Sequence, residues 1–200
     1  MQTFLPYPDF EQSAEALRND TKRLGKQRVE TLQILKALTQ GGGLHGGWAK
    51  HPASRMWENY ELALLKYQEA ICNVWVSKGY KDSCWEKSRA FFSPEELERY
   101  GRGDYDMPPW FGDPDFHLAH KSSLKQKAPE IYGDMFADAP DGMPYIWPGK
   151  TLVEASQQQQ QQQEQESMRA AEEAFEEDAF ESKVEQTIHE VEQQEHVKLV

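Results

Sequence analysis

The stretch from Lys22 to Glu30, which reads KRLGKQRVE, is the part of the sequence best suited to chemistry. One face of a helix here would carry Arg23, Lys26, Gln27 and Glu30, at spacings of three, four and seven residues. Two cations and an amide can bind phosphates or bases of a nucleic acid, and a carboxylate among them can act as acid or base. A solvated face of ion pairs is the alternative reading of the same pattern.

Gly25 and the position of the cluster favour the phosphate reading. A glycine inside a helix costs about 1 kcal/mol relative to alanine, which is tolerated where something must approach closely. The basic residues also lie near the start of the expected helix, where the dipole disfavours cations but favours a bound phosphate.

Two further segments place polar side chains on one helix face. His51, Arg55 and Glu58 either line a polar site, or His51 caps a helix while Arg55 pairs with Glu58. The second segment contains His117, His120 and Lys121. We expect this imidazole-rich face to contact phosphates or bases.

Neither histidines nor cysteines suggest a metal or a cofactor. His117 and His120 have no third ligand at a familiar spacing, and Cys72 and Cys84 form no CxxC pair. We therefore expect no metal site, no cofactor and a reducing compartment.

Helix starts at Asp9, Asp20, Ser93 and Asp113, together with helical periodicity, predict an all-α fold. The expected helices span about 9–18, 20–39, 52–78, 82–91, 93–101 and 113–127. No segment alternates with period two, so no sheet is expected. We predict a compact single-domain bundle around a central helix at about 52–78, with a glycine-rich loop at 41–47 and an irregular strap at 140–149.

Composition divides the chain near residue 150. Residues 1–150 hold 19 Lys and Arg against 21 Asp and Glu, a net charge of −2, whereas residues 151–200 hold 3 against 13, a net charge of −10. Every Trp and Tyr lies at or before Trp147. We therefore predict a folded domain at 1–150 and an appendage at 151–200.

The appendage opens with seven consecutive glutamines, Gln157 to Gln163, and continues rich in Glu, Ala and Gln. We expect a disordered or partly helical tail, with a coiled-coil or partner-binding helix as the alternative. No signal peptide and no membrane span is recognisable, so an intracellular protein is expected, cytoplasmic or, in a eukaryotic host, nuclear.

Several short motifs resemble the endonuclease V-like pyrimidine-dimer DNA glycosylase family, and in particular a bacterial branch that begins Met-Gln-Thr-Phe-Leu-Pro. The motifs are Arg23-Leu24-Gly25-Lys26, Gly47-Trp48, His51-Pro52, Met56-Trp57, Tyr60-Glu61, Ala70-Ile71-Cys72, Lys78-Gly79-Tyr80, Pro108-Pro109-Trp110, His117, His120-Lys121-Ser122, Pro129, Tyr132, Pro144-Tyr145 and Trp147-Pro148. The resemblance covers residues 1–148.

The resemblance implies a compact helical enzyme that flips a base out of damaged DNA and excises it. The family's nucleophile is the amine of the N-terminus, which forms a Schiff base with the sugar while a glutamate stabilises the intermediate. Gln2 is bulky, so we take the amine to be that of a retained Met1. The family's catalytic glutamate aligns with Arg23, and we expect Glu30 to replace it.

The sequence thus predicts a DNA glycosylase, with AP-lyase activity as an option, whose catalytic residues are Met1 and Glu30. Nucleic-acid contacts are expected from Arg23, Lys26, Gln27, His51, Arg55, His117, His120 and Lys121. The expected partner is double-stranded DNA with a damaged or modified pyrimidine, bound by a monomer, while the tail is free to bind another protein. The alternatives are a non-catalytic DNA- or nucleotide-binding module and a different nucleotide-directed enzyme.

Overall fold

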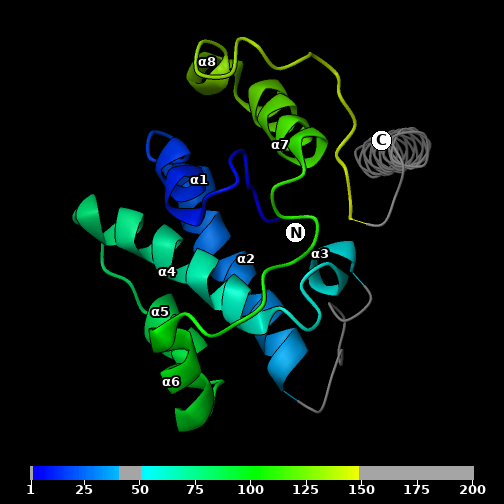
Figure 1. The fold of residues 1–200 in the computed structure, drawn as a ribbon. Helices are drawn as coiled ribbons and strands as arrows, with labels where there is room; N and C mark the ends of the chain where they lie inside the picture. The colour runs from blue at the N-terminus through cyan, green and yellow to red at the C-terminus, as the bar shows by residue number, and fades with distance from the viewer. Residues whose placement is uncertain (1, 41–50, 149–200) are drawn as a thin grey trace, which may run out of the picture. The chain divides into compact units, whose positions relative to one another are not determined.

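The computed structural model describes residues 2–40 and 51–148. Met1, the predicted glycine-rich loop at 41–47 and the predicted tail lie outside these residues. The described part is helical and contains no β-strand, as the sequence predicts (Figure 1).

Eight helices lie within the described residues. They are α1 (Phe10–Ala16), α2 (Thr21–Thr39), α3 (Pro52–Arg55), α4 (Glu61–Ser77), α5 (Cys84–Arg89), α6 (Pro94–Arg102), α7 (Pro114–Lys127) and α8 (Pro129–Tyr132).

Helices α1 and α2 begin at the capping residues that the sequence predicts. The Asp9 carboxylate accepts a hydrogen bond from the backbone N–H of Gln12 at 2.7 Å. The Asp20 carboxylate accepts one from the backbone N–H of Arg23 at 2.9 Å. Each bond satisfies one N–H group that the helix itself leaves without a partner.

The predicted continuous helix at 52–78 is wrong, because the chain leaves the helical conformation between α3 and α4. Asn59 has φ +71°, in the left-handed region, and its N–H bonds to Oε1 of Glu61 at 3.1 Å. A non-glycine residue with positive φ interrupts a right-handed helix, and asparagine tolerates this conformation better than most residues. The apolar stripe continues across this break, so periodicity alone hides it.

Helix α4 is the centre of the core. It contacts α1, α2 and α5, and its buried side chains include Leu64, Tyr67 and Ile71. Figure 1 shows α4 crossing α2 with α1 beside it. The central helix of the prediction is therefore present, but it is shorter.

Gly25 marks a close approach, as its position in the helix suggests, but the neighbour is another helix. A Cβ atom at Gly25 would lie 3.1 Å from Cζ3 of Trp75 in α4. The Trp75 ring also packs 4.1 Å from the Arg28 guanidinium and stacks on Tyr80 with ring centroids 4.3 Å apart. The glycine thus serves helix packing instead of phosphate binding.

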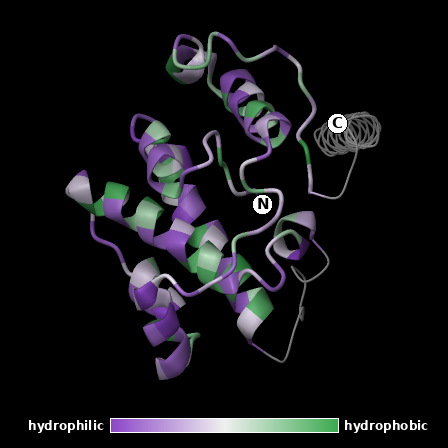
Figure 2. Ribbon diagram, in the orientation of Figure 1, coloured by the Kyte–Doolittle hydropathy of each residue, from purple (hydrophilic) through white to green (hydrophobic). Residues whose placement is uncertain are grey.

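The later helices follow the predicted start signals. Ser93 and Glu96 form a full capping box at α6, and Asp113 caps α7. Helix α6 has no buried residue, and Figure 2 shows it mostly in hydrophilic colours. Pro129 does not simply end a helix: it occupies the first turn of α8, where a missing N–H costs nothing.

The strap after α8 is irregular, as predicted, and packs against the domain up to residue 148. Ile146 is buried, and the Tyr145 hydroxyl donates a hydrogen bond to the carbonyl of Thr3 at 3.1 Å. The strap therefore reaches back to the first residues of the chain.

Candidate active site

The first residues of the chain form an extended segment inside the domain. Thr3, Phe4 and Leu5 are buried, and the segment from Gln2 to Leu5 contains no helical residue. Figure 1 shows this segment passing between α2 and α7. An extended segment has no internal backbone hydrogen bonds, so its buried polar groups need partners from elsewhere in the protein.

Gln27 on α2 supplies several of these partners. Its Oε1 accepts a hydrogen bond from the N–H of Phe4 at 2.9 Å, and its Nε2 donates to the carbonyl of Gln2 at 2.7 Å. The Tyr67 hydroxyl lies 2.8 Å from Oε1 of Gln27 and 2.9 Å from the carbonyl of Phe4. Gln27 is 1 % exposed, and its amide group is bonded to the N-terminal segment.

His117 and His120 form hydrogen bonds with the backbone of Leu5. The Leu5 N–H donates to Nδ1 of His120 at 2.8 Å. Nε2 of His117 accepts from the N–H of Gly112 at 3.0 Å, so its Nδ1 carries the hydrogen and donates to the Leu5 carbonyl at 2.7 Å.

Both histidines, which the sequence assigns to DNA contacts, lie inside the domain. His120 is fully buried and His117 nearly so. Burial lowers the pKa of both side chains, that of His120 well below its ordinary value. Neutral, buried imidazoles fit a role in fixing the N-terminal segment.

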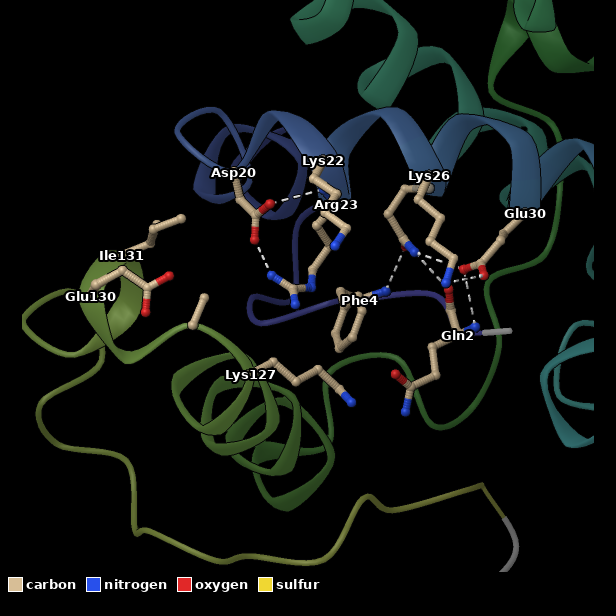
Figure 3. A pocket seen from close by; sticks show the side chains of 12 residues that line it. Gln2, Phe4, Asp20, Lys22, Arg23, Lys26, Glu30, Lys127, Glu130 and Ile131 are labelled. Carbon is tan, nitrogen blue, oxygen red and sulfur yellow. Dashed lines mark hydrogen bonds and ion pairs between the residues drawn. The ribbon is translucent and has the colours of Figure 1, made fainter. Parts of the chain in front are cut away.

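A pocket of about 490 Å³ opens beside this segment. Its lining comes from the first residues, from α2, and from the end of α7 with α8, and consists of Gln2, Phe4, Asp20, Lys22, Arg23, Lys26, Gln27, Glu30, Lys127, Ala128, Glu130 and Ile131. Figure 3 shows Lys127 across the pocket from the α2 side chains. The face that the sequence singles out on α2 thus lines one wall of a real cavity.

The first residues and Glu30 meet in this pocket. The backbone nitrogen of Gln2 donates to Oε2 of Glu30 at 3.3 Å, and Nε2 of Gln27 lies 3.3 Å from the same oxygen (Figure 3). The Glu30 side chain is 14 % exposed. A partly buried carboxylate next to the start of the chain can act on a proton or a cation formed there.

Arg23 is held by its neighbours. Its guanidinium pairs with the Asp20 carboxylate, and its centre lies 5.7 Å from the ring centroid of Phe4 and 5.8 Å from that of Tyr132. The Tyr132 hydroxyl donates to Asp20 at 3.3 Å, and burial raises the pKa of Tyr132. This packing leaves Arg23 little freedom to follow a substrate.

The lysines around the pocket are freer. Nζ of Lys26 lies 3.7 Å from Oε1 of Glu30, and its side chain is 70 % exposed. Lys22 and Lys127 are exposed and have no ion-pair partner within 4.0 Å among the described residues. The pocket rim can therefore attract phosphates through these amines.

The remaining predicted contact residues lie outside this pocket. His51 caps α3, accepting a hydrogen bond from the N–H of Ala53 at 3.1 Å, as one of the two alternatives predicts. The Arg55–Glu58 ion pair of the same alternative is not among the ion pairs of the described residues. Burial lowers the pKa of His51, and the Glu30 carboxylate opposes that effect. Arg55 is exposed on α3, and Nζ of Lys121 lies 5.0 Å from the Tyr7 ring centroid.

Lys22, Lys127 and Glu130 are pocket residues that the sequence reasoning did not select. Lys22 directly precedes the chosen face, and its positive charge was the available signal. Lys127 and Glu130 lie at the end of α7 and in α8. Local sequence patterns do not show that these helices lie near α2 in the fold. Within the described residues, no cluster of three or more His, Cys, Asp or Glu side chains is arranged to hold a metal ion.

Comparison with known families decides the relationship for the N-terminal part of the chain. Residues 1–87 match the family model described as pyrimidine dimer DNA glycosylase. The family resemblance is confirmed there. The glycosylase match contains the whole of α1 to α4, and therefore Glu30 and the α2 wall of the pocket.

The glycosylase family implies DNA as the substrate.

No curated protein and no solved structure matches the chain. In the described part of the chain, no helix has the length and apolar character needed to cross a membrane.

Proposed function

We propose that the protein is a DNA glycosylase that excises a damaged or modified pyrimidine through a Schiff base on its N-terminal amine. The observation that carries the proposal is the 3.3 Å contact between the nitrogen of Gln2 and Glu30 inside a lysine-rimmed pocket. If Met1 is removed, this nitrogen is itself the terminal amine. If Met1 is retained, the terminal amine belongs to the residue directly before Gln2.

The proposed excision of the base needs only the amine, water and proton transfers. The unprotonated amine attacks C1′ of the nucleotide, and the bond between C1′ and the base breaks while the base takes a proton. The bond between C1′ and O4′ then opens, O4′ takes a proton, and the nitrogen lone pair forms a protonated imine. Addition of water to C1′ releases the amine and leaves an abasic sugar.

An α-amine suits this reaction because its ordinary pKa is about 7.7 to 8.0, so a useful fraction is unprotonated at neutral pH. A lysine amine, with an ordinary pKa of about 10.4, would be almost fully protonated. In base excision, Glu30 has two roles: its carboxylate stabilises the protonated imine, and its acid form supplies the proton to O4′.

Strand cleavage would follow if the imine loses a proton from C2′ before water reaches it. The electron pair of that C–H bond then expels the 3′ phosphate, which is the AP-lyase reaction. Glu30, as a carboxylate next to the amine, is the base we propose for this proton. Lys22, Lys26 and Lys127 would hold the phosphates that flank the extruded nucleotide.

The test is base release from ultraviolet-irradiated duplex DNA by the wild-type protein and by Glu30→Gln, each with its native N-terminus. We expect the substitution to lower the excision rate at least about 100-fold, the lower range for acid–base catalysis. Glu130→Gln is the matched control, since Glu130 lines the same pocket but is exposed on α8. Equal rates for wild type and Glu30→Gln would contradict the role of Glu30.

We also propose that residues 1–150 form the glycosylase domain, which acts as a monomer, and that residues 151–200 are an acidic appendage. Deleting 151–200 should then leave the excision rate per molecule unchanged. A loss of excision activity on deletion would show that the appendage contributes to the reaction.

A further inference from the structure

We infer that Gln27 is a positioning residue, which aligns the chain's first residues with Glu30 for the reaction. The inference rests on the proposed function and assigns a second polar group of α2 to the same site. Gln27 is not assigned a catalytic role: it is buried, and its amide is bonded to the backbone of Gln2 and Phe4.

The hydrogen bonds of Gln27 use both ends of its amide group. Oε1 accepts from the N–H of Phe4, and Nε2 donates to the carbonyl of Gln2. These two bonds fix the peptide groups on either side of Thr3. Since the Gln2 nitrogen belongs to the same short stretch, these two bonds help to set its position relative to α2.

Gln27 also contacts the carboxylate that the amine must face. Its Nε2 lies 3.3 Å from Oε2 of Glu30, the oxygen that accepts from the Gln2 nitrogen. Gln27 and Glu30 are three residues apart on α2, so they are neighbours on one helix face. One rigid element therefore carries both the carboxylate and the group that holds the nucleophile next to it.

Other side chains also bond to the N-terminal segment, and they should keep it buried when Gln27 is replaced. His117 and His120 hold Leu5, and Tyr145 holds the carbonyl of Thr3. Within the described residues, none of these three side chains forms a hydrogen bond with Glu30. Removing Gln27 should therefore leave the segment in place but free to shift by a fraction of a residue at its end.

A shift of that size affects chemistry more than binding. Displacing reacting groups by about 1 Å can cost about 100-fold in rate, because the reaction needs the attacking atom in a narrow range of positions. DNA binding depends mainly on exposed cations, which a buried substitution leaves unchanged. We therefore expect a lower rate at unchanged affinity.

Gln68 provides a matched control within the same protein. It is also a fully buried glutamine, and it lies on α4, where its Nε2 donates to the carbonyl of Arg28 at 3.1 Å. Gln68→Met should destabilise the fold in a similar manner, but it touches neither the N-terminal segment nor Glu30. The comparison therefore separates positioning from stability.

The experiment measures single-turnover formation of the borohydride-trapped adduct with duplex DNA that contains one abasic site. Gln27→Met should form the adduct about 100-fold more slowly than wild type, with a dissociation constant for the DNA within about twofold. Gln68→Met should stay within about threefold of the wild-type rate at a temperature where both variants are folded. Gln27→Glu is the second variant, since it preserves shape and the acceptor oxygen but removes the donor to Gln2 and Glu30.

Two results would overturn the inference, and they differ from failure of the proposed function. Equal rates for Gln27→Met and Gln68→Met would show that Gln27 acts only through stability. A weaker DNA affinity with an unchanged rate would make Gln27 part of the binding surface. If the wild type itself forms no adduct, the proposed Schiff base is wrong and nothing remains for Gln27 to align.

Discussion

The backbone nitrogen of Gln2 lies 3.3 Å from Oε2 of Glu30, although 28 residues separate them in the chain. The contact exists because the buried first segment runs along α2 and because Glu30 points into the pocket that the segment borders. It places a carboxylate at the start of the chain even though Arg23 stands where the resemblance puts the family's catalytic glutamate.

Asn59 should be sensitive to substitution because of its positive φ. In the left-handed conformation, an L-residue with a Cβ loses about 1 to 2 kcal/mol, while glycine is free of this cost and asparagine bears part of it. We expect Asn59→Gly to be neutral or stabilising and Asn59→Val to destabilise by about 1 kcal/mol or more. Denaturant unfolding measures both.

Glu58→Val is the control for Asn59, because Glu58 is an exposed neighbour and Asn59 is the one non-glycine residue with positive φ among the described residues. Equal decreases in stability at positions 58 and 59 would show that the conformation of Asn59 has no energetic weight.

The stability of the domain should fall in mild acid because of His120. Burial lowers the pKa of this imidazole well below 6.5, so the folded protein keeps it neutral while the unfolded chain takes up a proton below pH 6.5. The unfolded state then binds more protons, and the free energy of unfolding decreases as the pH falls, by about 1.4 kcal/mol per pH unit for one such group.

Urea unfolding at pH 7.5, 6.5 and 5.5 measures this dependence. The His120→Asn variant can still offer an acceptor to the Leu5 N–H but has no group that titrates in this range. It should be less stable at pH 7.5 and lose less stability in acid. A variant with the wild-type pH dependence would exclude His120 as the source.

DNA binding should depend on salt in a way that reports on the pocket lysines. The slope of log affinity against log salt concentration becomes shallower by about 0.9 for each phosphate that the protein no longer neutralises. Lys127→Met should therefore reduce the slope by about one, whereas Lys87→Met, on the exposed face of α5, should not change it. Fluorescence anisotropy with lesion-containing duplex DNA at several salt concentrations gives the slopes, and identical values for both variants would remove Lys127 from the interface.

Local signals predicted the elements that local interactions determine. Asp9, Asp20, Ser93 and Asp113 cap helices where the sequence places them, since a cap bonds to an N–H two or three residues away. The break at Asn59 was missed because one residue's left-handed conformation leaves no trace in hydrophobic periodicity.

In the candidate site, too, the local features could be predicted from the sequence and the long-range contacts could not. The shared face of Arg23, Lys26 and Glu30 follows from helical spacing and is present in the pocket wall. The bonds of His117 and His120 to Leu5 could not be predicted, because Leu5 lies more than 100 residues away and no local pattern connects them. Polar residues at helical spacing can serve a buried backbone as well as a ligand, and only tertiary contacts distinguish the two cases.

The most direct test of the Schiff-base mechanism is intact-protein mass spectrometry after incubation with abasic or ultraviolet-irradiated duplex DNA and borohydride. We expect a covalent adduct that maps to the N-terminal peptide, and the same spectrum shows whether Met1 is present. An adduct on a lysine such as Lys127, or no adduct from protein that still binds the DNA, would contradict the mechanism.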